Sequence, residues 1–326
     1  MNRKPVIALI ATGGTIAGAA PSSSDTAAYV AGTVDVSALL SAVPGLEDIA
    51  DIRAETLFRL DSKDMTPTHW LALAQRVKAL ADADDIDGVL ITHGTDTVEE
   101  TAFFLHLTLA TAKPVVLTAA MRPATALSPD GPMNLFTAAR VAGSQQFGAL
   151  GTLVVMNDRI HAAREVCKWH TRAVEGIGSP DSGALGWANP PRLSRPGIAA
   201  DRALTPLASL DTSHWPPTVE VLYLSAGASP ALLDACIDAG AHGVVLACAG
   251  NGSLPQSWLP AVERAIAAGC AVVCGSRVAQ GRVGGGHLPA GVAYAGSLSP
   301  TKARVALMLA LNCGTPDLFR QIADYS

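Results

Sequence analysis

The sequence predicts an α/β protein with a larger N-terminal doubly wound sheet domain and a smaller C-terminal α/β domain. Short, continuously apolar runs alternate with amphipathic segments along most of the 326 residues. A proline-rich stretch without periodicity interrupts this rhythm around residues 190–217, and the alternation then resumes. Apolar strands separated by helices are typical of a parallel sheet with both faces covered, and a chain of this length suits one large domain or two modest ones.

In the N-terminal part, four apolar runs predict strands, at residues 6–12, 88–92, 114–118 and 151–156. Amphipathic segments at residues 66–81 and 96–110 predict helices between them. The first of these helices should begin at Thr66-Pro67, because this pair suits an N-cap and a first helical position.

The proline-rich residues 191–217 predict a linker between a domain at 1–190 and a second one at 218–326. Beyond the linker, strands are expected at residues 219–225, 243–249 and 271–276, with helices at 230–239 and 258–268.

Composition excludes several classes of function. Hydrophobic residues make up 49% and charged ones 16%, so the chain can bury a sizeable core. The net charge is −5 and no cluster of Lys and Arg occurs, which argues against a nucleic-acid or anionic-membrane surface. No uncharged apolar stretch approaches the roughly 18 residues that a membrane-spanning helix needs.

The N-terminus and the cysteines indicate the cytoplasm. The apolar run at residues 6–11 is short and leads into a Thr-Gly-Gly-Thr turn without a small-residue cleavage site, so it predicts a buried strand rather than a secretory signal. The six cysteines lie mostly inside apolar runs, and none shows the spacing of zinc ligands. We therefore expect buried, reduced thiols and no metal.

Candidate chemistry lies in two polar turns, because ligands of doubly wound sheets bind at the carboxyl ends of the strands. The first turn, TGGTIAG at residues 12–18, contains neither of the two glycine-rich patterns that bind phosphate groups, Gly-x-x-x-x-Gly-Lys and Gly-x-Gly-x-x-Gly. Its glycines would let backbone N–H groups approach a ligand and leave Thr15 as the reactive hydroxyl. Taken alone, such a turn is more often structural.

The second turn, THGTDTVEE at residues 92–100, should follow about the fourth strand. It places Thr95 and Asp96 at a helix N-terminus, where Asp96 could simply be a cap. Glu99 and Glu100 are expected to complement the helix dipole and to do nothing more.

The two turns together resemble the signatures of the bacterial-type L-asparaginase family, which includes the type I and type II asparaginases and glutaminases. The signatures read ATGGTIAG at residues 11–18 and ITHGTDTVEETA at residues 91–102. Collinear segments also resemble the family, with KPVV at 113–116, AMRP at 120–123, DGPMNL at 130–135, VVMND at 154–158 and GNG at 250–252. The resemblance covers nearly the whole chain and implies hydrolysis of L-asparagine to L-aspartate and ammonia.

The resemblance also implies catalytic roles. Thr15 matches the primary threonine nucleophile, and Tyr29 matches the tyrosine of a mobile lid that helps to activate it. Thr95 and Lys168 match a second Thr–Lys pair. On the residues alone, Lys168 would be read as a surface lysine and Tyr29 equally well as a loop aromatic.

For substrate binding, the resemblance implies that Asp96 holds the α-ammonium and Ser62 the α-carboxylate. Asn251 matches a residue that a neighbouring subunit lends to the site, which implies a homotetramer built from intimate dimers. Asn251 also suits a plain Gly-Asn-Gly turn with a left-handed Asn, and both interpretations can hold together.

The chemistry agrees with these roles. A threonine hydroxyl is a poor nucleophile at neutral pH and needs a nearby base. A lysine amine can accept that proton where burial or a neighbouring cation favours its neutral form. Backbone N–H donors would stabilise the oxyanion, each typically lowering the barrier by about 3 kcal/mol. The reaction requires no metal or cofactor.

The sequence departs from the family pattern at two places. Lys63 occupies a substrate-binding position where well-known members carry a glutamine, and its ammonium would repel that of the substrate unless it pairs with Asp61 or Asp64. The loop at residues 281–291 is glycine-rich and contains no glutamate, whereas some members present one there. Both departures remove affinity for the amino end of the substrate, and they argue against glutaminase side activity and high affinity more than against the reaction itself. Two other functions stay open, a broader amidase acting on glutamine or D-asparagine and a catalytically weak binding protein on the same fold.

Overall fold

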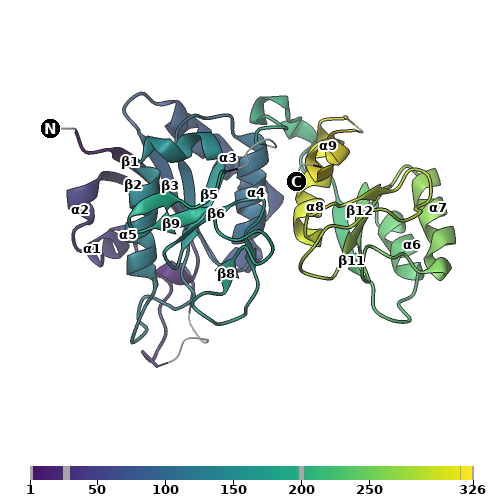
Figure 1. Ribbon diagram of the computed structural model, residues 1–326, viewed down its shortest axis with the longest axis horizontal. Coiled ribbons are helices and arrows are strands. Elements are labelled where there is room, and N and C mark those ends of the chain that lie inside the picture. The colour runs from purple at the N-terminus through teal and green to yellow at the C-terminus, as the bar shows by residue number, and fades with distance from the viewer. Residues whose placement is uncertain (1–2, 25–29, 198–201, 316, 325–326) are drawn as a thin grey trace. The chain divides into compact units, whose positions relative to one another are not determined.

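The computed structural model describes residues 3–24, 30–197, 202–315 and 317–324 (Figure 1). It divides into two compact units, Met1–Ala203 and Leu204–Ser326. Unit 1 is built on a large mixed sheet and unit 2 on a smaller parallel sheet, with helices in both units. The predicted fold class is therefore confirmed.

The sheet of unit 1 has eight strands in the order β10-β9-β6-β5-β4-β3-β1-β2. Their bounds are Val6–Gly13 for β1, Asp51–Leu60 for β2, Gly88–Thr92 for β3, Val115–Thr118 for β4, Thr152–Met156 for β5, Arg159–Ala162 for β6, Gly186–Ala188 for β9 and Pro191–Leu193 for β10. The strands β2, β1, β3, β4 and β5 run parallel to one another, and β1 and β3 are buried along their whole length.

Helices cover both faces of this sheet. Figure 1 shows α3 (Pro67–Asp82) and α4 (Val98–Thr108) on one side and α5 (Gly131–Ala142) on the other. The short helices α1 (Val36–Ser41) and α2 (Leu46–Ile49) belong to the α5 side, where residues after α1 and in α2 join the core of that face. The N-cap of α3 is Thr66, as the sequence predicts, and His69 completes a capping box with it.

The sheet is mixed, because its β6 side is antiparallel where the sequence predicted parallel strands. The strands β5 and β6 are antiparallel, and Met156 pairs with Arg159 across a two-residue loop. The loop residues Asn157 and Asp158 have φ of 49° and 59°. Two consecutive left-handed residues match the twist of a tight hairpin, and Asn and Asp tolerate that conformation better than other non-glycine residues.

The stretch expected as a linker is partly structured. Residues 191–193 form β10, which pairs with β9 at the edge of the sheet of unit 1. The two compact units divide between Ala203 and Leu204. The domain boundaries at 190/191 and 217/218 stay a prediction.

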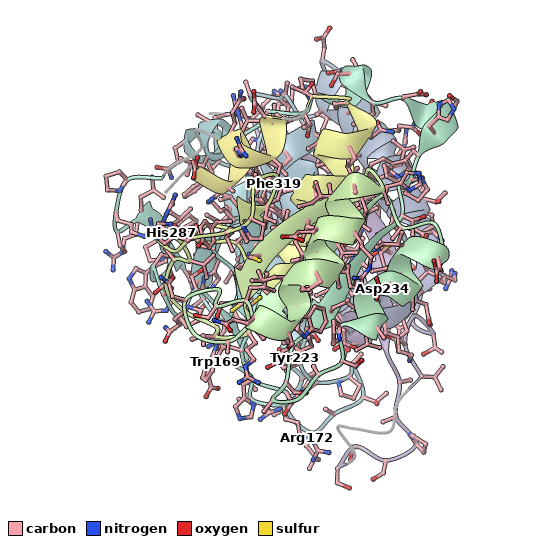
Figure 2. All side chains as sticks on the ribbon, turned by 90° about the vertical axis from the view of Figure 1, so that its right-hand side faces the viewer. Trp169, Arg172, Tyr223, Asp234, His287 and Phe319 are labelled. Carbon is pink, nitrogen blue, oxygen red and sulfur yellow. The ribbon has the colours of Figure 1, made fainter. Side chains whose placement is uncertain are left out.

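Unit 2 contains the parallel sheet β11-β12-β13-β14, with bounds Val219–Tyr223, Gly243–Cys248, Ala271–Ser276 and Ala293–Tyr294. Figure 1 shows α6 (Ala231–Asp238) and α7 (Leu259–Ala267) on one side of this sheet and α8 (Pro300–Asn312) on the other, followed by α9 (Leu318–Asp324). Asp234, labelled on α6 in Figure 2, pairs with Arg264 of α7 and ties these two helices together.

The six cysteines are free thiols. Cys248, Cys270 and Cys274 are buried in the core of unit 2, where Trp258 and the apolar side chains of β12 and β13 surround them. The other three are half-buried, and of these Cys167 lies in unit 1. Burial is thus confirmed for three thiols and only partial for the rest. In the described part of the chain, no helix is both long and apolar enough to cross a bilayer.

Candidate active site

Three loops leave the sheet of unit 1 side by side. The strands β2, β1 and β3 are adjacent and parallel, so the loops at their carboxyl ends emerge at one edge. Ala11 pairs with Thr92, and Gly13 pairs with Leu60. The two polar turns of the sequence are therefore neighbours, and the second one follows the third strand of the chain rather than the fourth.

The two polar turns, one after β1 and one after β3, touch through their backbones. Gly14 has φ of 81°, and a Cβ built on it would lie 2.4 Å from the backbone nitrogen of Gly94. A Cβ on Gly94 would in turn lie 2.5 Å from Ser62 Oγ. Only glycine fits at such a contact. Thr15 and Thr95 directly follow these two glycines, and both threonines are buried, each 4% exposed.

Further bonds fix the same loops. Thr12 Oγ1 donates to the carbonyl of Thr92 at 2.9 Å, and the backbone N–H of Gly14 donates to the carbonyl of Leu60 at 2.8 Å. Thr15 begins a single 3₁₀ turn, Thr15–Ala17, which is wholly buried. The first turn is thus held from both sides by its neighbouring strands.

Ser62 connects the loop after β2 to the loop after β3. It begins the 3₁₀ turn Ser62–Asp64, which the side chain of Asp61 caps. Ser62 Oγ accepts from the backbone N–H of Asp96 at 3.1 Å, and its carbonyl accepts from Thr97 Oγ1 at 2.8 Å. The buried Ser62 hydroxyl therefore lies against Asp96.

Lys63 pairs with Asp61. Its Nζ donates to Asp61 Oδ2 at 2.5 Å, and this hydrogen bond raises the pKa of Lys63. The Lys63 side chain is 65% exposed. Of the two alternatives that the sequence leaves open, the structure has the paired lysine rather than an uncompensated ammonium.

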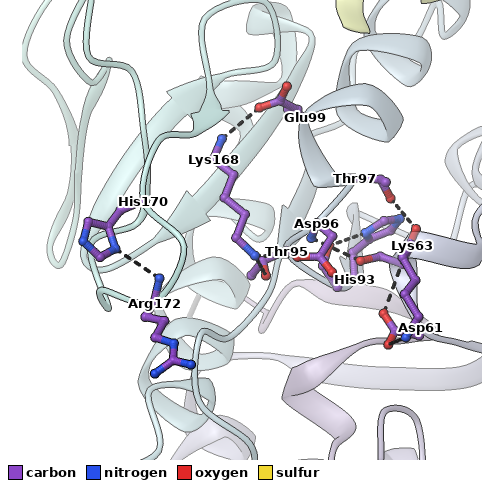
Figure 3. Close-up of polar contacts among 12 residues, drawn as sticks. Asp61, Lys63, His93, Thr95, Asp96, Thr97, Glu99, Lys168, His170 and Arg172 are labelled. Carbon is purple, nitrogen blue, oxygen red and sulfur yellow. Dashed lines mark hydrogen bonds and ion pairs between the residues drawn. The ribbon is translucent and has the colours of Figure 1, made fainter. Parts of the chain in front are cut away.

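Lys168 brings the second turn together with a distant segment. It lies in β7 (Cys167–Lys168), which pairs with β8 (Ile177–Gly178) in a two-stranded ribbon separate from the large sheet. Its Nζ donates to Thr95 Oγ1 at 2.9 Å and to Asp96 Oδ1 at 2.5 Å (Figure 3). Lys168 is not a free surface lysine, and Asp96 is not the helix cap, because the N-cap position of α4 is Thr97.

The sequence assigned no role to His93 and only a dipole role to Glu99. His93 is fully buried, and its Nδ1 donates to the carbonyl of Gly94 at 2.8 Å. Burial lowers the pKa of His93 to about 4, so it is neutral near pH 7 beside the charged groups of the turn. Glu99 Oε2 accepts from the backbone N–H of Lys168 at 2.8 Å, which the dipole interpretation missed. A contact across 69 residues leaves no signal in local sequence.

Two further site residues, Tyr29 and Asn251, were expected from the sequence. Tyr29 falls outside the described residues. Asn251 lies in unit 2, where its Nδ2 donates to the carbonyl of Gly284 at 2.7 Å and its Oδ1 accepts from the N–H of the same residue at 3.1 Å. The left-handed residues of its turn are Gly250 and Gly252, with φ of 51° and 72°, rather than Asn251. The glycine-rich loop at residues 281–291, to which Asn251 is hydrogen-bonded, carries the exposed His287 (Figure 2).

Comparisons with known proteins identify the family. The family models "Asparaginase, N-terminal" and "Glutaminase/Asparaginase C-terminal domain" match residues 6–195 and 218–322. L-asparaginase 2 of Bacillus subtilis is 40% identical over 94% of this chain and 82% of its own length. A glutaminase-asparaginase of Acinetobacter glutaminasificans is 39% identical over 94% of each chain.

A solved structure is also similar. The crystal structure of a probable cytoplasmic L-asparaginase from Campylobacter jejuni matches with a TM-score of 0.90 and 38% identity, over 98% of this chain and 99% of the other. Two domain models and relatives near 40% identity thus cover most of the chain. The chain belongs to the asparaginase family.

Proposed function

We propose that this chain is an L-asparaginase that hydrolyses the side-chain amide of L-asparagine, with Thr15 as the nucleophile. The observation that carries the proposal is the position of Lys168. Its ammonium bridges a buried threonine hydroxyl and a carboxylate, on a turn that contacts the Thr15 turn backbone to backbone. A hydroxyl, an amine and a carboxylate are the groups that amide hydrolysis needs, and the reaction calls for no cofactor.

The proposed reaction has two stages. Thr15 Oγ attacks the side-chain carbonyl carbon of asparagine and loses its proton to the site, and the C–N bond then breaks as the amine takes up a proton and leaves as ammonia. Water attacks the resulting aspartyl ester and releases aspartate together with the Thr15 hydroxyl. In this scheme Thr95 and Lys168 relay protons, and Tyr29 assists Thr15 from the lid.

Asp96 has the properties of a receptor for the substrate's α-ammonium. Its side chain is 48% exposed even though Lys168 binds one of its oxygens, so part of the carboxylate stays accessible. An arriving ammonium would share this carboxylate with Lys168. The Ser62 hydroxyl, next to Asp96, is proposed to bind the α-carboxylate, with Lys63 at the rim.

We propose a homotetramer of intimate dimers in the cytoplasm. The support is Asn251, which the family pattern assigns to a neighbouring subunit's site, and which the structure fixes to the loop at residues 281–291 by two hydrogen bonds. Sedimentation at assay concentration tests the assembly, and an active monomer would contradict a shared site.

Glutamine is the second candidate substrate. The observation in its favour is that a full-length relative is named a glutaminase-asparaginase. The same site chemistry serves both amides, which differ by one methylene, and an apolar pocket discriminates such a difference by only about 10- to 200-fold.

A single assay tests these proposals. Ammonia release is measured with L-asparagine, L-glutamine and D-asparagine, for the wild type and for Thr15→Ala and Thr95→Ala. Both variants should lose measurable turnover and keep the thermal unfolding transition, whereas Thr212→Ala, at an exposed threonine of unit 2, should stay fully active. A loss of only a few-fold would remove that threonine from the catalytic list, and binding without turnover in the wild type would indicate a binding protein.

A further inference from the structure

The geometry points to Glu99 as a positioning residue for this reaction. Its carboxylate holds the backbone of Lys168, and through that backbone it places the lysine ammonium on Thr95 and Asp96. This inference rests on the proposed function, since it concerns the same Thr–Lys pair.

The strand that carries Lys168 is weakly supported. The strands β7 and β8 have two residues each and form a sheet of their own, so neither gains hydrogen bonds from the eight-stranded sheet. A two-stranded hairpin is marginal by itself in water. The position of this ribbon must therefore depend on contacts outside it.

Glu99 supplies such a contact from the rigid side of the site. It belongs to the first turn of α4, a helix whose residues are almost all buried. Its Oε2 accepts from the Lys168 N–H at 2.8 Å (Figure 3), and a hydrogen bond to an ionised acceptor is stronger than one between neutral groups.

Lys168 is consequently held at both ends by one five-residue segment. The backbone end is bound by Glu99, and the ammonium end by Thr95 and Asp96. A lysine side chain rotates about four bonds, so its ammonium reaches the same place repeatedly only if its backbone is anchored. Thr95 and Asp96 directly precede the N-cap of α4, and Glu99 lies in its first turn. The residue that holds the lysine backbone and the residues that bind its ammonium therefore keep their spacing when the ribbon moves relative to the sheet.

The first arm of the test uses single variants, assayed for kcat, KM and thermal unfolding. Glu99→Ala should lower kcat by about 10- to 100-fold, the usual loss for a displacement near 1 Å in an active site. Glu99→Gln keeps an oxygen that can accept the same bond and should restore most of the rate. Glu175→Ala removes an exposed carboxylate between β7 and β8 and should change nothing. Unchanged kcat in Glu99→Ala would overturn the inference.

The second arm is a double-mutant cycle with Lys168→Met. If Glu99 acts through Lys168, Glu99→Ala should cost little in kcat once the amine is absent, whereas a purely structural role would lower kcat by the same factor in both backgrounds. If Glu99→Ala does not fold, Glu99→Asp, shorter by one methylene, takes its place in the cycle. Near-normal activity of Lys168→Met alone would refute the proposed function rather than the role of Glu99.

Discussion

Replacement of Gly14 by alanine tests whether the two polar turns work as one unit. Gly14 has φ of 81° and ψ of −177°, a region open almost only to glycine, so a side chain there costs about 1–3 kcal/mol. The added Cβ would also lie 2.4 Å from Gly94 N, about 1 Å inside ordinary contact at 3.4 Å. Relief of such overlap in a packed interior typically costs another ~1–3 kcal/mol.

The overlap must displace one turn relative to the other, because the added Cβ is fixed to the backbone of residue 14 and the atoms that it meets, in His93 and Gly94, are backbone atoms. Thr15 and Thr95 directly follow the contacting glycines, so a shift near 1 Å should reduce kcat by about 100-fold. Ammonia release from asparagine measures kcat, and equilibrium unfolding in urea measures the expected loss of roughly 2–6 kcal/mol in stability.

Gly45→Ala provides the matched control. Gly45 has φ of 80°, and the nearest atom to its added Cβ is Asp48 Oδ2 at 3.9 Å, so this variant carries the left-handed backbone cost without the overlap. It should lose about 1–2 kcal/mol and keep full activity. If Gly14→Ala matched Gly45→Ala in stability and the wild type in kcat, the contact between the turns would have no catalytic importance.

Three other variants or conditions have defined outcomes. Lys168→Met should lower kcat by about 10²- to 10⁴-fold without recovery at high pH, in steady-state assays, as expected for a lost general base. Lys63→Gln should change KM for asparagine less than about threefold, because the Lys63 ammonium already pairs with Asp61; a tenfold fall in KM would show that it opposes the substrate. Burial lowers the pKa of His93 and His161 to about 4 from 6.5, so each takes up a proton on unfolding between those pH values. Urea titrations should therefore show stability falling as the pH drops through this window, by up to roughly 3 kcal/mol per histidine, and a flat profile between pH 6.5 and 4 would refute the neutral, buried state.

The buried parallel strands were predictable because their signal is local. The strands β3 and β4 are unbroken apolar runs in the sequence, and the pair Thr66-Pro67 predicts the N-cap of α3. By contrast, β2 has polar residues throughout and is partly exposed along its length, so it lacks that signal. The short strands β6, β9 and β10 owe their structure to pairing partners.

The candidate site divides in the same way. Thr15, Thr95 and Asp96 stand in recognisable turns at strand ends, which sequence alone can identify. The pairing of Lys168 with Thr95 spans 73 residues, and only the resemblance to a family indicated it. Two other contacts depend on how distant segments meet in three dimensions, the hydrogen bond from Lys168 to Glu99 and the contact of Gly14 with Gly94. The identities of these residues do not predict either contact.

The distribution of thiols gives each unit its own chemical reporter. Cys248, Cys270 and Cys274 are sealed in the core of unit 2, so a thiol reagent can modify them only when that core opens. Cys167, next to Lys168 in the ribbon, is half-buried and is the one cysteine of unit 1. Labelling rates at Cys167 therefore report the opening of the lysine ribbon, while those at the buried three report the unfolding of the C-terminal core. One mass spectrum taken at successive times would separate local loosening at the site from loss of the fold.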